Sequence, residues 1–431
     1  MTGDHQKLPA RYWRQWSASA ISNLGDGINF VAMPLLVFSL TTDERALALT
    51  TFALFVPWLV IGLPVGVVVD RLDRKRLMAS SSLLRSGLFA AIAWLVSSDH
   101  LTVLALVALL IVIGSCEVVF DSAAQAFLPS LVPKHQLARA NGLLFAAEVI
   151  AGSVAGLSVG ALLFEASPSL PFTVNAISFV IAAGLIVSIS THRDAVRPTQ
   201  SDRRLSVGVS WLRTHRTLRT LAMMFVVTNF GLMFGQGIFV KYAIETLDLS
   251  PVGYGLLLAI TAMGAATGGL VGHRVIGRFG LAKSVIGPYL VFGVAQVIIG
   301  IAPSAWLVGI AGYFLGAAIT VWNVVTVTIR QQLIPVAIFG RVNAVYRWLG
   351  AAASAAGVAC GGFLAYWTNL HTPYLVGGGV TLVAALLCGG PVIAGLRHDA
   401  HADDASPGAA TSDDDQDDQA PERAIAPPSI T

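Results

Sequence analysis

Apolar runs recur along the whole chain, and each is close to the roughly 20 residues that a helix needs to cross a lipid bilayer. Only 12% of the 431 residues are charged, against roughly a quarter in soluble domains. A transmembrane β-barrel would instead show short segments of alternating hydrophobicity. The sequence therefore predicts an all-α polytopic membrane protein with twelve transmembrane helices, at residues 17–40, 47–69, 78–97, 101–123, 141–164, 171–189, 219–240, 252–275, 283–301, 304–329, 342–367 and 374–396.

The longest connection between these runs divides them into two sets of six. The segment LVPKHQLARANG at 131–142 is repeated as LIPVAIFGRVNA at 333–344, and SNLG at 22–25 returns as TNFG at 228–231. Two parallel repeats of six helices place a substrate cavity between them, near the middle of the membrane. We expect a first six-helix bundle, a cytoplasmic loop, a second six-helix bundle and a disordered acidic tail, at residues 1–191, 192–218, 219–397 and 398–431.

The positive charges are distributed unevenly between the two sides of the predicted membrane. Of the 27 lysine and arginine residues, 25 fall on one side, and this count assigns Arg85 to the connection after the second run. Only Arg45 and Lys241 remain for the other side. Because such residues gather in cytoplasmic loops, we expect a multi-pass protein of the inner (plasma) membrane with both termini in the cytoplasm. The basic residues thus reflect topology, and no nucleic-acid partner is expected.

Acidic residues inside the predicted helices are confined to the first half of the chain. Ionising an acid there is unfavourable, so such residues are functional by default. Asp26 shares a helix stripe with Ser22 and Asn29, and we expect this stripe to face the cavity. A proton and a cationic substrate could compete for its carboxylate; alternatively, Asp26 is hydrogen-bonded within the bundle and fixes the helix. The other acids in the runs are Glu117, Asp121 and Glu148.

Glu117 and Glu148 are candidates for proton coupling or substrate contact, with structural pairing and helix packing as the alternative readings. Polar residues in other runs either line the cavity or form hydrogen bonds between helices; these candidates are Asn175, Asn229, Gln236 and Asn323. Lys241 is predicted to lie at the membrane interface, with its charge in water. The small residues Gly152, Gly156 and Gly160 favour close packing of the fifth helix.

Residues 66–78, GVVVDRLDRKRLM, resemble the signature loop of the major facilitator superfamily. Asp73 stands where the family usually has glycine, and the matching residues are Gly66, Asp70, Arg71, Arg74, Lys75 and Arg76. Residues 117–144 and 330–347 resemble bacterial drug:proton antiporters of the macrolide-efflux and enterobactin-exporter kind. The resemblance implies the twelve-helix major facilitator fold, with this loop as a cytoplasmic gate.

Within that gate, the resemblance implies that Asp70 locks one half against the other. It also implies that Arg74 pairs with an acid at the cytoplasmic end of the fourth helix, where Asp121 lies. The chain departs from the family at two places. Leu157 stands where such antiporters often carry a proline, and Glu117 lies in the region of the fourth helix where many relatives carry an arginine.

These features predict a secondary active transporter that exports a small amphipathic compound in exchange for protons. A siderophore or secondary-metabolite exporter, an uptake symporter of the same fold, and a membrane scaffold or sensor that transports nothing are the alternatives. The chain has no Walker loop, Ser-His-Asp order or HExxH motif, so we expect no enzyme activity and no cofactor. Its three cysteines have no metal-ligand spacing, so no metal is expected. The expected partners are protons, a small-molecule substrate and the lipid bilayer, and the expected state is a monomer.

Overall fold

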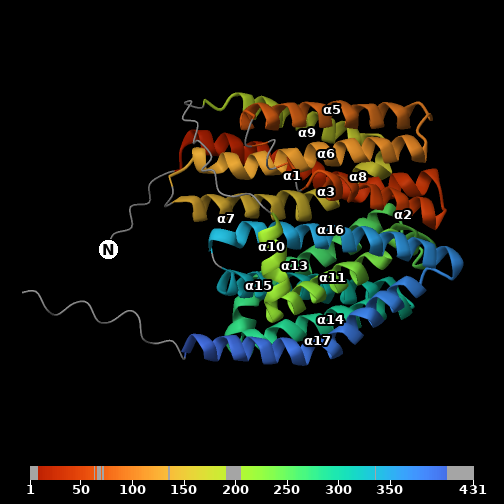
Figure 1. Ribbon diagram of the computed structural model, residues 1–431. Helices are drawn as coiled ribbons and strands as arrows, with labels where there is room; N and C mark the ends of the chain where they lie inside the picture. The colour runs from red at the N-terminus through yellow and green to blue at the C-terminus, as the bar shows by residue number, and fades with distance from the viewer. Residues whose placement is uncertain are drawn as a thin grey trace, which may run out of the picture.

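The computed structural model describes residues 8–62, 64–65, 69, 72–133, 136–190, 205–334 and 336–404. All regular elements in these ranges are helices (Figure 1). Three residues of the predicted gate, Gly66, Asp70 and Arg71, lie outside the described residues. So do residues 191–204 of the central connection and 405–431 of the tail.

The N-terminal half runs from α1 to α9, coloured red to yellow in Figure 1. Its fifth transmembrane segment is continuous through α7, a π-helix and α8. The helices of this half are α1 (Ala10–Leu40), α2 (Glu44–Ala53), α3 (Val56–Val60), α5 (Arg74–Ser97), α6 (Val103–Phe127), the short η1 (Leu128–Ser130), α7 (Leu137–Ala147), the π-helix η3 (Glu148–Gly156), α8 (Leu157–Ala166) and α9 (Leu170–Val187).

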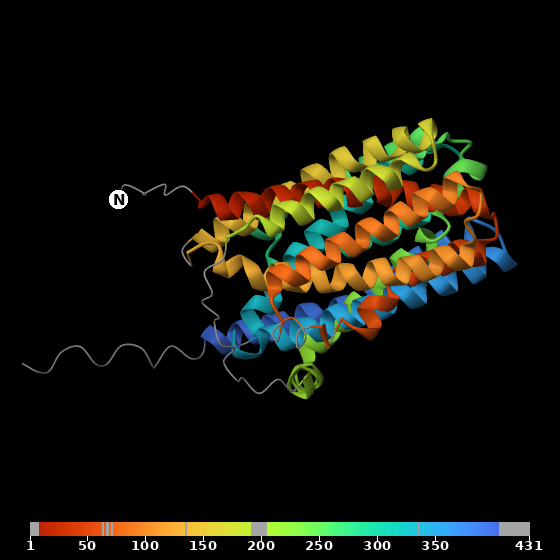
Figure 2. The same ribbon diagram turned by 90° about the horizontal axis from the view of Figure 1, so that it is seen from above.

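The C-terminal half runs from α11 to α17, coloured green to blue. Before it comes α10 (Leu205–Thr214), which packs on α16 and crosses the long helices (Figures 1 and 2). The remaining helices are α11 (Arg216–Gln236), α12 (Phe239–Lys241), the π-helix η4 (Tyr242–Thr246), α13 (Pro251–Phe279), α14 (Leu281–Ile301), α15 (Ala305–Leu333), α16 (Val336–Trp367) and α17 (Thr372–Asp404).

Eleven helices of the described chain are long and apolar enough to cross a membrane. The run expected at 47–69 differs, because its described part is divided into α2 and α3. The amides of Leu54 and Phe55 donate to carbonyls only three residues back, which ends the α-helical pattern. Pro57 follows at the start of α3, where its missing N–H is tolerated. The interrupted segment packs against α6 and α16, in the position of a twelfth membrane crossing.

Polar side chains define where several helices begin. Asp43 caps α2, Asp73 caps α5 and Thr102 caps α6, each by accepting a hydrogen bond from a backbone N–H of the first turn. Ser250 caps α13, whose first residue is Pro251. These caps fix the connections between crossings, and the apolar faces of the helices then pack into two bundles.

The two bundles lie side by side, with α2 and α3 packed against α16 and with α8 packed against α13. The start of α1 and the end of α17 lie at the same end of the molecule (Figures 1 and 2). We call this the terminal end and the opposite one the distal end. The repeat in the sequence is visible in the helix starts, since α15 begins 202 residues after α6 and α11 begins 206 residues after α1.

Candidate functional site

A cavity of about 1220 Å³ lies between the two halves. In the N-terminal half its lining extends to Pro129 and Leu137, at the terminal ends of η1 and α7. All charged residues of the described lining belong to this half: Asp26, Arg85, Glu117, Asp121 and Glu148. The C-terminal half contributes uncharged residues of α11, α13 and α15, among them Met233, Gln236, Thr261 and Leu315.

Arg85 is the residue that sequence reasoning missed. Its Nη2 donates to Oδ1 of Asp26 at 2.7 Å and lies 3.5 Å from Oε2 of Glu117. The guanidinium carbon lies 4.1 Å from the centroid of the Phe179 ring. The side chain is only 3% exposed and projects from within α5, so its assignment to a cytoplasmic connection is wrong. The available signal was its position inside the apolar run at 78–97.

This pairing determines what Asp26 can do. The buried guanidinium of Arg85 stabilises the ionised carboxylate, while 36% of the Asp26 side chain remains exposed. A proton or a cationic group entering the cavity must therefore compete with Arg85 for this carboxylate. Both residues line the cavity, so Asp26 is held by Arg85 and is at the same time partly open to the cavity.

The other three acids follow the same wall of the cavity. Glu117 and Asp121 lie one turn apart on α6, so both face the cavity. Glu148 is the first residue of the π-helix η3 and is exposed. A π-helical turn is rare and is found frequently at functional sites. The structure thus brings all four acids predicted from the sequence to one cavity.

The cavity-facing stripe of α1 differs from the one that we expected. It contains Ser22 and Asp26, but Asn23 completes it in place of Asn29. Asn29 is turned to the other side of Asp26 by the helical period, and its Oδ1 is buried without a hydrogen-bond partner. The prediction that Asn29 lines the cavity is therefore wrong.

Asn175 is also absent from the cavity lining. It is completely buried on α9, where its Oδ1 accepts a hydrogen bond from Oγ of Ser178 at 3.1 Å. Both side chains lie against Gly25 of α1, so tightly that a Cβ there would be 2.1 Å from Oδ1 of Asn175. Asn175 therefore belongs to a helix contact.

The three glycines of the fifth transmembrane segment lie against α1. A Cβ on Gly156 would be 2.7 Å from the Cα of Gly27, and one on Gly160 would be 2.5 Å from the carbonyl oxygen of Ile28. A Cβ on Gly152 would be 3.2 Å from the carbonyl oxygen of Asn23. Two backbones approach this closely only where side chains are absent.

The described basic residues of the predicted gate bind helix ends within their own half. Arg74 donates to the carbonyl of Ala126 at 2.8 Å, near the end of α6. Lys75 donates to the carbonyl of Ile189 at 2.7 Å, just beyond α9. Arg76 lies beside Asp73, the cap of its own helix. Positive charges at helix C-termini are favourable, because the carbonyls there carry partial negative charge.

At the distal end, Lys241 joins the two halves. Its Nζ donates to the carbonyl of Thr42 and to Oε1 of Glu44, both at 2.6 Å, and lies 3.7 Å from Glu245. The side chains of the pair are only 11% and 18% exposed. The expectation that Lys241 lies at the lipid interface is therefore wrong, since it bridges α12 to the start of α2.

Arg45 makes a second distal contact between the halves. Its guanidinium carbon lies 3.9 Å from the centroid of the Tyr366 ring of α16. It also forms a hydrogen bond that holds the pKa of Asp43 below its ordinary value. Thus Arg45 and Lys241, the two cations that the sequence left for this side, both link the halves there. The lining of the cavity extends toward the terminal end.

Comparison with known proteins decides the family. Residues 10–408 match the major facilitator family described as transmembrane secretion effectors. The chain belongs to that family. It is 22% identical over 404 residues to macrolide efflux protein A of Streptococcus pyogenes, covering 90% of this chain and 96% of the relative. It is 26% identical over 380 residues to the multidrug efflux pump Tap of Mycolicibacterium fortuitum, covering 83% and 90%.

The fold agrees with solved transporters. A mutant form of the nucleoside transporter NupG superposes with a TM-score of 0.76 at 10% identity, covering 88% of this chain and 99% of that one. The chain is therefore a multi-pass transporter with the major facilitator fold, as predicted, and not an enzyme. Its relatives include efflux proteins, and the cavity between the bundles is the natural place for a small-molecule substrate.

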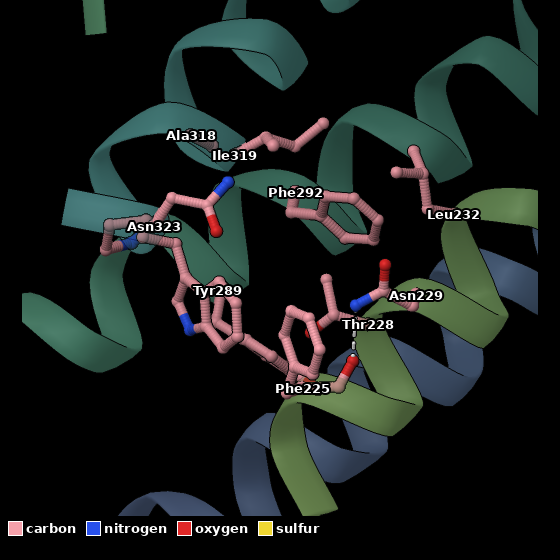
Figure 3. A pocket seen from close by; sticks show the side chains of 11 residues that line it. Phe225, Thr228, Asn229, Leu232, Tyr289, Phe292, Ala318, Ile319 and Asn323 are labelled. Atoms are coloured by element: carbon pink, nitrogen blue, oxygen red, sulfur yellow. Dashed lines mark hydrogen bonds between the residues drawn. The ribbon is translucent and has the colours of Figure 1, made fainter. Parts of the chain in front are cut away.

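The C-terminal half of the transporter contains a second, smaller pocket, of about 50 Å³. Asn229 and Asn323, two of the predicted polar candidates, lie on opposite sides of it (Figure 3). The Asn229 amide donates to the carbonyl of Phe225 at 2.8 Å. Leu232 and Ile319 line both this pocket and the large cavity, so the two spaces adjoin.

Proposed function

We propose that this transporter exports a small amphipathic compound bearing a positive charge, in exchange for protons and by alternating access. The observation that carries the proposal is the paired cluster of Asp26, Arg85 and Glu117 at the wall of the large cavity. The relatives named as macrolide and multidrug efflux proteins support export as the direction.

The charge of the lining favours a cation over an anion. Four acids face the cavity and one arginine accompanies them, so the wall has net negative charge when the acids are ionised. The opposite wall is apolar or neutral, as Met233 and Leu315 illustrate. An amphipathic cation can place its charge near Glu148 or Asp121 and its apolar part on the C-terminal half. An anionic siderophore would meet like charge there, so this alternative fits the site less well.

Exchange follows from competition at Asp26. When a proton neutralises the carboxylate, its attraction to Arg85 weakens, and a cation held by the same wall is also released. A ligand shifts the equilibrium between two conformations only if it binds one of them more tightly. Proton and cargo would each occupy the acidic wall in one orientation, so the pH gradient would drive the cargo in the opposite direction.

The proposed topology places both termini in the cytoplasm and the protein in the inner (plasma) membrane, as a monomer. The terminal end then faces the cytoplasm, and the cavity of this structure extends toward the compartment from which an exporter collects its cargo. The distal contacts of Lys241 and Arg45 would close the outer side. An uptake symporter would use the same site, and the direction of flux separates the two alternatives.

The test uses the purified protein in liposomes with an imposed pH gradient and tetraphenylphosphonium as the cargo. The wild type should move this cation against the proton flow. Asp26→Asn should abolish the gradient-driven flux while leaving binding of the cation measurable, because the carboxamide cannot be ionised. Glu165→Gln is the matched control, since Glu165 is an exposed acid near the end of α8 and outside the cavity lining.

Unchanged flux in the Asp26→Asn protein would refute the coupling role and return this residue to an internal brace. Flux in the same direction as the protons would favour the uptake symporter. A wild type that neither binds nor moves the cation would refute the substrate class.

A further inference from the structure

The small pocket of the C-terminal half is built from aromatic and amide side chains. Phe225 stacks on Trp322, with ring centroids 5.7 Å apart and an interplanar angle of 3°. Tyr289 and Phe292 of α14 also line the pocket, and none of its described lining residues is charged. Asn323 lies at its edge and is itself exposed (Figure 3).

The internal repeat shows what this pocket corresponds to in the N-terminal half. The offset of 202 between α6 and α15 matches Asp121 to Asn323. The offset of 206 between α1 and α11 matches Asn23 to Asn229. The pocket therefore occupies, in its own half, the place that the acidic wall occupies in the other.

The third transmembrane segment of each half, α5 or α14, explains why the small pocket lies in the C-terminal half. When α14 is aligned to α5 with an offset of 203 residues, the buried positions of the two helices correspond. This alignment pairs the buried Phe89 of α5 with the buried Phe292 of α14. The same offset matches Arg85 to Pro288, which lines the pocket. A long charged side chain fills the N-terminal half at this level, whereas the short proline ring leaves room in the C-terminal half.

Two groups at the pocket are available for hydrogen bonds to a ligand. Trp322 is only 5% exposed, and its buried Nε1 has no hydrogen-bond partner. The side chain of Asn323 is exposed and lines the pocket, so its amide is available to a ligand that enters there. A buried N–H group without a partner is unfavourable, so an acceptor brought by a ligand would be stabilised there.

We propose that this pocket is a subsite for an uncharged, oxygen-bearing substituent of the cargo, such as a hydroxyl, carbonyl or ether group. The proposal rests on the function proposed above. The volume of about 50 Å³ admits a substituent of a few atoms and not a whole cargo molecule. The cargo reaches it past Leu232 and Ile319, which border both spaces. One molecule then contacts the acidic wall with its cation and the amide pocket with its oxygen.

The test compares two probes that differ by one oxygen: tetraphenylphosphonium and (4-hydroxyphenyl)triphenylphosphonium. Binding of each to the purified transporter is measured by calorimetry in detergent. The wild type should bind the hydroxyl probe about two- to tenfold more tightly, the range expected for one hydrogen bond. Asn323→Leu, which keeps a similar size and removes the amide, should abolish this preference and leave the affinity for the parent cation unchanged.

Gln236→Leu is the matched control, because it removes an amide from the large cavity and leaves the small pocket intact. Trp322→Phe is a second variant, which keeps an aromatic ring against Phe225 and removes the N–H; it should reduce the preference even if Asn323→Leu does not fold. Equal binding of both probes by the wild type, or a preference that survives in both pocket variants, would overturn the assignment of the pocket alone. Failure of the parent cation to bind the wild type would refute the proposed function as well.

Discussion

The N-terminal half has Asp26 and Arg85 at the wall of the large cavity, whereas the matching positions of the C-terminal half are Leu232, which lines the large cavity, and Pro288, which lines the small pocket. The helices of the two halves nevertheless begin at nearly constant offsets, so the scaffold is repeated while the chemistry is not. In the proposed exchange, only the charged wall responds to protons. The other wall is then free to take the shape of the cargo.

The largest expected effect comes from removing the positive charge of the N-terminal wall. Arg85→Leu leaves the carboxylates of Asp26 and Glu117 without their buried partner. Breaking a fully buried pair costs about 3–5 kcal/mol, and because these two carboxylates are partly exposed to the cavity we expect the lower end of that range. We expect a corresponding fall in the free energy of unfolding, measured by equilibrium unfolding of the purified protein in mixed micelles. Pro288→Ala is the control from the matching position of the C-terminal half, where no charge is affected.

The double variant Asp26→Asn with Arg85→Leu sharpens this test. Because it removes both charges of the closest pair, part of the lost stability should return, while proton-driven flux should stay absent. If Arg85→Leu were no less stable than Pro288→Ala, the two walls would not differ in the way that the structure indicates.

A smaller effect should be common to both halves, because both use glycine where the first and fifth helices meet. A Cβ on Gly27 would be 2.1 Å from the carbonyl oxygen of Gly152, and one on Gly361 would be 1.9 Å from that of Phe234. Gly27→Ala and Gly361→Ala should therefore each lower the free energy of unfolding by about 1–3 kcal/mol through overpacking.

Gly87 provides the control for these variants, since a Cβ there meets nothing within 4 Å. Gly87→Ala should leave unfolding unchanged in the same micelle assay. If Gly27→Ala lowered the free energy of unfolding strongly and Gly361→Ala did not lower it, the halves would differ in packing as well as in charge.

The fold could be predicted from the sequence because length and hydrophobicity alone determine a membrane helix. Counting charges by side of the membrane was less successful for Arg85, which was assigned to a loop although it lies within an apolar run. The count cannot distinguish a loop cation from one held inside a bundle by Asp26, because that distinction depends on a partner far away in sequence. Lys241 was misread for the same reason, since Glu44 lies 197 residues away.

The sequence also could not predict in which direction the side chains of the transmembrane helices point. The sequence places Asn29 and Asn175 on transmembrane helices, but it does not show which face meets the cavity. Asn23 and Asn29 lie three residues to either side of Asp26, so rotating α1 about its axis by less than one turn would exchange them in the lining. The cavity-facing position of Asp26 was predicted correctly, and Glu117, Asp121 and Glu148 line the same cavity, because an ionisable side chain in a bilayer faces an interior or a water-filled space.

A third prediction concerns the contact between Lys241 and Glu44, which joins the two halves at the distal end. Glu44→Gln removes the charge opposite Lys241. If the contact between the halves became weaker by about 1.4 kcal/mol, the ratio of molecules with the distal end joined to those with it open would change about tenfold. We expect a larger fraction of molecules with the distal end open. Spin labels at His100→Cys and Thr368→Cys, one in each half and with the native cysteines replaced by alanine, report this as a longer distance in pulsed electron resonance.

Glu245→Gln is the control for this measurement. Glu245 belongs to the same half as Lys241, so its substitution leaves the bond between Lys241 and Glu44 in place. Its distance distribution should match that of the unmodified pair of labels. Identical distributions for Glu44→Gln and Glu245→Gln would show that the buried pair does not bias the distal end.

The smallest effect tests whether charge can be moved from one wall to the other. Asn323→Asp recreates in the C-terminal half the carboxylate that Asp121 supplies in the N-terminal half. Because Asn323 is exposed, solvent weakens the added attraction, and a gain of about 0.2–1 kcal/mol is expected. Tetraphenylphosphonium should then bind up to about fivefold more tightly at low salt, and the gain should shrink as salt is added. Proton-driven flux should not increase, because the new acid has no buried arginine at the position of Pro288 to respond to its protonation. A variant that bound the cation no better, or that transported it faster, would show that charge alone does not separate the two walls.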